Sequence, residues 1–379
     1  MIPKTKKSVL FIFGTRPEAI KLAPVIRTFQ SCAEFRTVVC VTGQHRAMLD
    51  QVTGFFEIKP DFDLDLMTHN QSLPGLASKA ITGSAEILIQ VKPDILFVQG
   101  DTTTAFAAGF AAFLEKIPVA HVEAGLRSYR KDSPFPEEMN RVLLSHLTTL
   151  HFPPTEGAGQ NLAREGITEN VFVVGNTVVD ALLQGLEIIR NRGEESYYSA
   201  FKGLDFSKRI ILVTVHRRES FGSPLRRICE AIKTVADAGG DREIVYPVHL
   251  NPNVRETVFE MLGKTKNIHL LDPLEYAQFI WMMSKSSLII TDSGGVQEEA
   301  PSLGVPVLVV REVTERGEGV AAGAATMVGA ETERIIAEAE KKLRPRGEKP
   351  KDCRNPYGDG QSSSRILEIT RRHLLSRSP

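Results

Sequence analysis

The stretch LIITDSGGVQEEAPSLGVPVLVV, residues 288–310, decides the fold of this chain. An apolar run leads into Ser293 and two glycines, and a short helical pattern then precedes a second apolar run at 305–310. This order of strand, glycine turn, helix and strand is the unit from which parallel sheets are built. Backbone amides exposed at Gly294 and Gly295 can bind a phosphate or diphosphate at the helix start. An ordinary tight turn with Ser293 as the helix cap explains the same residues equally well.

The length and composition of the chain narrow the possible functions. Its 379 residues predict about two or three domains, and 42% hydrophobic with 24% charged residues is typical of a soluble globular protein. Because 46 Lys and Arg balance 46 Asp and Glu, bulk charge predicts neither nucleic-acid nor membrane binding. The four cysteines lack metal-ligand spacing, so we expect no zinc site and a reducing, cytoplasmic location. The apolar segment 9–13 is too short for a signal peptide, and no run approaches the ~20 residues of a membrane helix.

Strand and helix patterns alternate along the whole chain. The apolar runs that predict strands lie at residues 8–13, 37–42, 95–98, 118–122, 171–174, 210–215, 243–247, 268–271, 288–290, 305–310 and 325–328. Near-continuous apolar strands are covered by helices on both faces of a parallel sheet. A polar, glycine-containing stretch at 192–207 interrupts the alternation. We therefore expect an α/β protein with two doubly wound Rossmann-like domains facing a cleft, residues 1–190 and 191–360.

Polar side chains gather where the predicted strands end, which is where open parallel sheets bind ligands. They are Arg16, Glu18, Gln44, His45, Asp101 and Glu123 in the first half, and His216, Arg217, Arg218, His249 and Ser293 in the second. Lys21 stands five residues after Arg16 across a helix start, close enough to serve the same anion. Residues 216–218 form a basic turn that suits phosphate neutralisation. No Walker A pattern and no GxGxxG follows a strand, so the sequence predicts neither ATP nor a dinucleotide.

Three carboxylates in the first half differ in how well a structural role explains them. Asp101 could be only the cap of its helix. Glu137 opens a helix and could simply favour the helix dipole. Glu123 lies between a buried strand and Ala-Gly, where a carboxylate has little structural use. Lone histidines such as His45 and His249 are most often structural.

Segments spread in order over nearly the whole chain carry a family resemblance. The matching segments include FGTRPEAIKLAP (13–24), TGQHRAMLDQ (42–51), GDTTTAFA (100–107), HVEAGLRS (121–128), PFPEEMNR (134–141), HRRESFG (216–222), DPLEYAQF (272–279) and TDSGGVQEEAPSLGVPVLVVRE (291–312). With these motifs the chain resembles the non-hydrolysing UDP-N-acetylglucosamine 2-epimerases of bacteria.

The resemblance implies a GT-B architecture in which the terminal helix, 361–379, packs back on the first domain. It also implies a homodimer that interconverts UDP-GlcNAc and UDP-ManNAc by eliminating and re-adding UDP through 2-acetamidoglucal. It implies no cofactor and no metal, and a place in envelope or capsule polysaccharide synthesis. A hydrolysing epimerase that releases ManNAc and UDP remains an alternative, as does a glycosyltransferase of GT-B shape.

The resemblance also implies roles for individual positions. The catalytic set is Asp101, Glu123, Glu137 and His216. The substrate-binding set is Arg16, Lys21, Asp101, Glu123, Arg141, His216, Leu274, Phe279, Ser293, Gly294, Gly295, Glu299 and Arg316. The possible regulatory set is Gln44, His45, Arg217 and His249.

The chain departs from the family pattern at two places. The segment TERGEG at 314–319 stands where the family commonly has Thr-Glu-Arg-Pro-Glu-Ala, and its two glycines predict a looser loop. Ala47 and Asn70 replace side chains that some family members use at a regulatory site. The resemblance therefore implies substrate binding, whereas these departures leave activation by UDP-GlcNAc undetermined by the sequence.

Overall fold

The chain forms two compact units, which we describe separately. The computed structural model describes residues 6–43, 46–66, 71–343 and 355–375. Unit 1 comprises Met1–Gln184 and Gly358–Pro379, and unit 2 comprises Gly185–Tyr357. The division falls inside helix α7 (Thr177–Arg192), whereas the sequence pattern sets the boundary at residue 190. Because the helix runs unbroken across the division, its periodicity contains no signal of where one unit ends.

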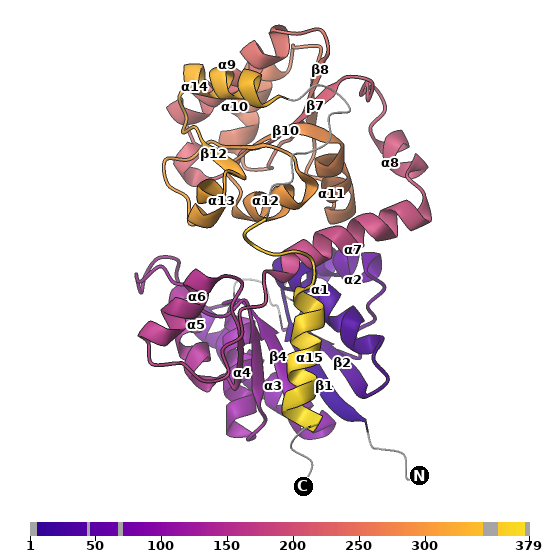
Figure 1. Ribbon diagram of the computed structural model, residues 1–379, viewed down its shortest axis with the longest axis vertical. Coiled ribbons are helices and arrows are strands. Elements are labelled where there is room, and N and C mark those ends of the chain that lie inside the picture. Colours follow the sequence, from indigo (N-terminus) through magenta and orange to yellow (C-terminus); the bar gives the residue numbers. More distant parts are fainter. Residues whose placement is uncertain (1–5, 44–45, 67–70, 344–354, 376–379) are drawn as a thin grey trace. The chain divides into compact units, whose positions relative to one another are not determined.

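Unit 1 is a six-stranded parallel sheet covered by helices (Figure 1). Its strands are β1 (Lys7–Phe13), β2 (Phe35–Val41), β3 (Phe62–Asp63), β4 (Ile95–Gln99), β5 (Val119–Val122) and β6 (Leu150–Phe152). Its helices are α1 (Arg16–Gln30), α2 (Arg46–Phe55), α3 (Leu73–Val91), α4 (Thr103–Leu114), α5 (Glu137–Leu147), α6 (Glu156–Arg164), the first part of α7, and α15 (Ser362–Leu375). The strand order is β3-β2-β1-β4-β5-β6.

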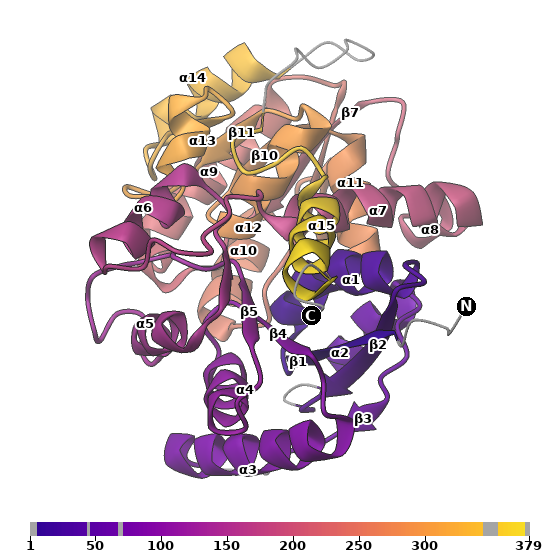
Figure 2. The ribbon, with the colours of Figure 1, turned by 60° about the horizontal axis from the view of Figure 1, so that its bottom comes forward.

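The two faces of this sheet bury alternate residues of each strand, as the two-residue period of a strand requires. On one face, Leu10 and Ile12 pack in a core cluster with apolar residues of α3 and α4. On the other, the Phe11 ring stacks on Phe97 with centroids 4.7 Å apart and meets the Phe29 ring of α1 edge-on. Figure 2 shows the resulting layers, with α1 and α15 on one side and α3 and α4 on the other. Burial on both faces explains why the strands read as continuous apolar runs.

The terminal helix α15 belongs to unit 1, where it packs against α1. The fully buried carboxylate of Asp180 accepts hydrogen bonds from the backbone N–H groups of Ser362 at 3.3 Å and Ser363 at 2.7 Å. A carboxylate at these free amides satisfies donors that the first turn of a helix cannot pair internally. This cap fixes the start of α15 on α7.

Unit 2 repeats the architecture with the strand order β12-β11-β10-β7-β8-β9. Its strands are β7 (Arg209–Thr214), β8 (Arg242–Pro247), β9 (Ile268–Leu271), β10 (Ser286–Thr291), β11 (Val307–Val309) and β12 (Ala325–Met327). Its helices are α8 (Glu195–Ala200), η1 (Arg218–Ser220), α9 (Ser223–Asp237), α10 (Pro252–Leu262), α11 (Tyr276–Lys285), α12 (Gly294–Glu299), η2 (Ala300–Leu303), α13 (Gly317–Ala321) and α14 (Thr332–Lys342). The single tryptophan of the chain, Trp281, is buried in this unit.

Both sheets have the strand order 3-2-1-4-5-6 when strands are numbered within each unit. This is the doubly wound Rossmann order, so the predicted fold class is confirmed. The order reverses between β1 and β4 in unit 1 and between β7 and β10 in unit 2. Ligands of such sheets bind at these switch points, beyond the carboxyl ends of the strands.

One predicted strand is wrong. In the segment 171–174 only Val171 forms an isolated bridge, to His151, and the sixth strand is β6 instead. The segment lies beside β6, where the backbone N–H of Phe172 donates to the His151 carbonyl and that of Val174 donates to the Pro153 carbonyl. Because Pro153 has no N–H to donate, no regular ladder continues there.

No helix in the described part of the chain is both long and apolar enough to cross a membrane.

Candidate functional site

The switch point of unit 1 begins with the turn between β1 and α1. The Thr15 side chain and Glu18 form a reciprocal capping box, and the Glu18 carboxylate also accepts the backbone N–H of Gly14 at 3.1 Å. Thr102 donates its hydroxyl to the other Glu18 oxygen at 2.7 Å, which joins the loops after β1 and β4. Burial raises the pKa of Glu18, and the hydrogen bonds it accepts oppose that rise. Glu18, which the sequence pattern placed only near a strand end, therefore connects the two loops of this switch point by hydrogen bonds. Arg16 is the first residue of α1.

Glu123 follows β5 in a backbone conformation that few side chains adopt. Its φ is +65°, in the left-handed region, which costs roughly 1–2 kcal/mol for a residue with a Cβ. The conformation turns the carboxylate into a buried polar cluster. Lys21 Nζ lies 2.5 Å from Oε1, Asn176 Nδ2 donates to the same oxygen at 3.3 Å, and Gln99 Nε2 donates to Oε2. A strained, buried and multiply held carboxylate is typical of functional sites.

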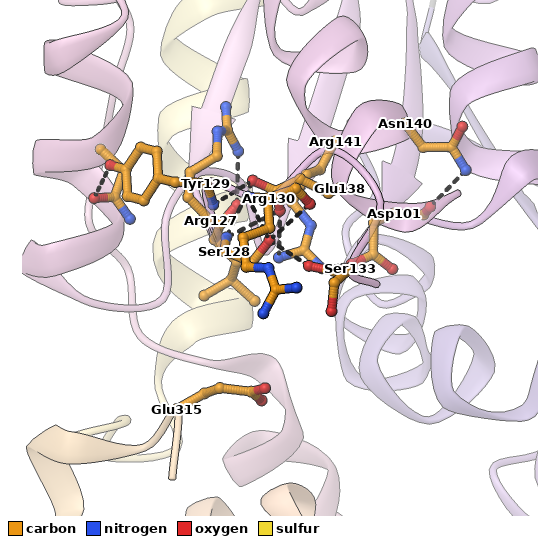
Figure 3. Close-up of polar contacts among 12 residues, drawn as sticks. Asp101, Arg127, Ser128, Tyr129, Arg130, Ser133, Glu138, Asn140, Arg141 and Glu315 are labelled. Carbon is orange, nitrogen blue, oxygen red and sulfur yellow. Dashed lines mark hydrogen bonds and ion pairs between the residues drawn. The ribbon is translucent and has the colours of Figure 1, made fainter. Parts of the chain in front are cut away.

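Asp101 follows β4 at the same edge of the sheet. Arg141 Nη2 lies 2.6 Å from Asp101 Oδ2, and the Asn140 side chain donates to the Asp101 carbonyl at 3.0 Å (Figure 3). Burial raises the pKa of Asp101, the Arg141 guanidinium opposes it, and the Glu123 charge adds to the rise. The Lys21 charge lowers the same pKa, and the Glu137 charge raises it. Unit 1 therefore brings Lys21, Asp101, Glu123, Glu137 and Arg141 into one electrostatic neighbourhood.

Glu138 was not among the candidates, yet it shapes this neighbourhood. Its buried carboxylate accepts the backbone N–H of Ser128, at 3.1 and 3.0 Å, and of Tyr129, at 2.8 Å. Arg141 Nη1 lies 3.5 Å from Glu138 Oε2, so Glu138 also orients the guanidinium that contacts Asp101 (Figure 3). Its place in the first turn of α5, one residue after Glu137, is a signal that could have identified it.

The loop 126–136, between β5 and α5, is held together by hydrogen bonds and ion pairs of its basic and polar side chains. Arg127 is buried and holds both carboxylate oxygens of Glu165 at 2.7 Å. Ser128 donates its hydroxyl to the Ser133 carbonyl at 2.6 Å. Arg127 is thus a structural residue, because its charge is fully used inside the unit.

The switch point of unit 2 is organised by Asp292, another residue that the sequence analysis did not select. This carboxylate is completely buried after β10. Its Oδ2 accepts the backbone N–H groups of His216 at 2.9 Å and Arg217 at 2.8 Å, and the Ser220 hydroxyl at 3.2 Å. Three donors to one carboxylate oxygen fix the turn after β7. Asp292 is the last residue before Ser293 in the opening stretch, so its position was visible in the sequence and its partners were not.

His216 is exposed above this carboxylate. Its Nδ1 lies 3.6 Å from Asp292 Oδ1, and its ring is near-parallel to His249, with centroids 5.5 Å apart. Desolvation lowers the pKa of His216, the Asp292 charge opposes it, and His249 and Arg217 add to the fall. The lowered pKa favours the uncharged imidazole, which can hydrogen-bond an anion without neutralising it.

The glycine turn after Asp292 is lined by an arginine. Ser293 caps α12 without a side-chain hydrogen bond, and its backbone N–H donates to Thr291 Oγ1 at 2.9 Å. A Cβ added to Gly294 would lie 3.5 Å from Arg316 Nη2, so the guanidinium rests beside this turn. Arg316 Nε donates to the buried Glu298 at 2.5 Å. Glu298 thereby orients the Arg316 guanidinium. Glu298 was not among the residues selected from the sequence.

The remaining candidate residues make no contact described above with the polar clusters of the two switch points. Leu274 lies in the loop before α11 and Phe279 within α11, and both are partly buried. Glu299 is buried at the end of α12, with Oε2 3.9 Å from a Cβ added to Gly295. Gln44 and His45 lie outside the described residues. Within those residues no group of three His, Cys, Asp or Glu side chains could hold a metal ion.

The fold and the polar side chains at both switch points define the class of this protein. It is a two-domain Rossmann-like α/β protein of the GT-B type. The family model described as UDP-N-acetylglucosamine 2-epimerase matches residues 27–371. The chain belongs to this family, whose members are isomerases.

Individual relatives are similar over almost their full length. The chain is 50% identical over 375 residues to a UDP-N-acetylglucosamine 2-epimerase of Escherichia coli K12, covering 97% of this chain and 99% of the relative. It is 47% identical, with a TM-score of 0.85, to the crystal structure of UDP-GlcNAc 2-epimerase from Neisseria meningitidis bound to UDP-GlcNAc, which covers 96% and 99% of the two chains. A co-structure of MnaA from S. aureus with UDP is 40% identical, with a TM-score of 0.83 and coverage of 98% and 99%.

Proposed function

We propose that this chain interconverts UDP-GlcNAc and UDP-ManNAc by inverting C2 of the sugar. The observation that carries the proposal is the buried Glu123 carboxylate, held in a strained conformation against Lys21 at the switch point. Membership of the epimerase family supports it, as does a related structure bound to UDP-GlcNAc. The reaction needs no redox partner, since the proton removed from C2 is replaced by another.

The carboxylates of unit 1 would perform the proton transfers. One carboxylate removes the C2 proton as the C1–O bond breaks, which yields 2-acetamidoglucal and UDP. Re-addition of UDP at C1 with protonation of C2 from the opposite face gives the epimer. Glu123, Asp101 and Glu137 are the proposed acid and base groups. Because burial raises the pKa of Asp101, this residue is suited to hold a proton nearer neutral pH.

The departing diphosphate would be stabilised by donors from both sequence halves. The free amides of Gly294 and Gly295, the Arg316 guanidinium and the neutral His216 imidazole are the proposed donors of unit 2. Arg16 and Lys21 are the proposed cations of unit 1, and Arg141 holds Asp101 in place. Leu274, Phe279, Ser293 and Glu299 complete the proposed nucleotide-sugar set. The proposed regulatory set is Gln44, His45, Arg217 and His249. Of these, Arg217 and His249 lie in the described part of the chain, next to His216.

The proposal is tested by incubating the protein with UDP-GlcNAc in heavy water and following the products by NMR. We expect UDP-ManNAc, and UDP-GlcNAc recovered from the reverse reaction, to carry deuterium at C2. Accumulation of free ManNAc with UDP would instead establish a hydrolysing epimerase. Absence of C2 exchange without an acceptor would reject epimerisation and favour a transferase or a nucleotide-sugar sensor.

We also propose that the chain acts as a homodimer in the cytoplasm, a location that suits its few, scattered cysteines. Helix α4 packs against both α3 and α5, and all three helices leave large apolar side chains exposed. Ile89 is 54% exposed, Phe113 56%, Leu114 57% and Leu143 44%. Exposed apolar groups gathered on neighbouring helices are typical of an interface, and a second copy would cover them.

Sedimentation of the Phe113→Asp variant tests this interface. We expect the wild-type chain to sediment as a dimer and the variant to dissociate at least tenfold more readily, because a carboxylate would be buried without a partner. Phe259→Asp in α10 is the matched control, since Phe259 is 41% exposed in the other unit. A variant that stays as dimeric as the control would place the interface elsewhere.

A further inference from the structure

A pocket of unit 2 lies outside the residues assigned above. Its volume is about 320 Å³, which is within the roughly 300–1,000 Å³ of small-molecule sites. It is formed by the loop after β7, the start of α9 and the loop after β11, with Ser220, Pro224 and Val310 in its wall. All of its lining residues belong to unit 2.

Two arginines with unused donors line this pocket. Arg311 is only 9% exposed, and its Nε donates to Glu219 Oε1 at 2.5 Å. Arg227 donates its Nε to the Ala330 carbonyl at 3.0 Å. Among the described residues, the terminal nitrogens of both guanidinium groups have no hydrogen-bond partner. Arg227 is partly buried, and these terminal nitrogens are available to donate to the acceptors of a ligand in the pocket.

The acidic side chains of the pocket restrict what such a ligand can be. Glu219 and Glu312 also line it, so the pocket is close to electroneutral and would not concentrate a bare anion strongly. Carboxylates accept hydrogen bonds from hydroxyl groups, whereas paired arginine forks match the oxygens of a phosphate. The Ser220 hydroxyl is already donated to Asp292, so the four charged side chains are left as the polar contacts.

We infer that this pocket binds a phosphate monoester of a small polyhydroxylated compound, such as a sugar phosphate. The phosphate would sit between the forks of Arg227 and Arg311, and the hydroxyl groups would face Glu219 and Glu312. The inference does not rest on the proposed epimerase reaction, because none of these four side chains belongs to the set assigned to it.

Calorimetric titration of the full chain with glucose 6-phosphate tests the inference. Saturating UDP is kept present so that a nucleotide site cannot produce the signal. We expect glucose 6-phosphate to bind, inorganic phosphate to bind at least fivefold more weakly, and glucose not to bind. Absence of glucose 6-phosphate binding, or equal affinity for inorganic phosphate, would overturn the assignment.

Variants locate the binding and separate it from catalysis. Arg311→Gln and Arg227→Gln are each expected to weaken glucose 6-phosphate binding at least tenfold. Arg226→Gln is the matched control, because Arg226 is the neighbour of Arg227 on α9 and pairs with Glu260 outside the pocket. Circular dichroism confirms that each variant is folded. Affinity that survives in both Arg311→Gln and Arg227→Gln would place the ligand elsewhere, whatever the outcome of the heavy-water experiment.

Discussion

Replacing Glu123 by Gln is expected to reduce deuterium incorporation at C2 by about 10²–10⁴-fold, the usual contribution of a positioned acid or base. Glutamine keeps the size and most hydrogen bonds of the side chain, so the polar cluster with Asn176 and Lys21 can still form. It cannot accept the C2 proton. NMR in heavy water measures the exchange rate, and calorimetry measures the affinity for UDP. We expect the affinity for UDP to change by less than about threefold, because the proposed diphosphate donors lie mainly in unit 2.

Two comparisons make this result interpretable. Glu156→Gln is the control, because Glu156 is exposed in the first turn of α6 and should leave exchange unchanged. Thermal unfolding of both variants shows whether lost exchange reflects lost folding. Exchange in Glu123→Gln within tenfold of the wild type, with both variants folded, would remove Glu123 from the acid–base chemistry.

Replacing Asp292 by Ala is expected to lower the unfolding free energy of unit 2 by roughly 3–5 kcal/mol. The change leaves the N–H groups of His216 and Arg217 and the Ser220 hydroxyl without their acceptor, and each buried unsatisfied donor costs about 1–3 kcal/mol. Urea unfolding followed by Trp281 fluorescence measures the loss. Trp281 is the only tryptophan and is buried in unit 2, so its signal reports on this unit alone.

Milder substitutions divide this effect into its parts. Ser220→Ala removes one of the three hydrogen bonds and should cost about 1 kcal/mol. Asp292→Asn retains an acceptor for the backbone donors and should recover most of the lost stability. If Asp292→Ala and Ser220→Ala destabilise equally, the carboxylate does not organise the turn, and the positioning of His216 must come from another group.

The sequence alone determined the fold class, and it predicted the candidate site at one edge of each sheet. Strands buried on both faces must be apolar throughout, so their pattern is readable residue by residue. Polar residues that end such strands stand out because no core requires them, and Asp101, Glu123, His216 and Ser293 were found in this way. The segment 171–174 misled the same reasoning, because an apolar run does not reveal that Pro153 interrupts the ladder beside it.

Only the tertiary structure decided which residues position the others. Glu18, Glu138, Asp292 and Glu298 act through partners that are distant in the chain or on the backbone, and Asp292 reaches across 75 residues to hold Arg217. Arg127 has a structural role that the sequence does not reveal, because its guanidinium pairs with the carboxylate of Glu165. A one-dimensional pattern records the type of a side chain, whereas its role depends on which donors and acceptors the folded chain brings within about 3 Å of it.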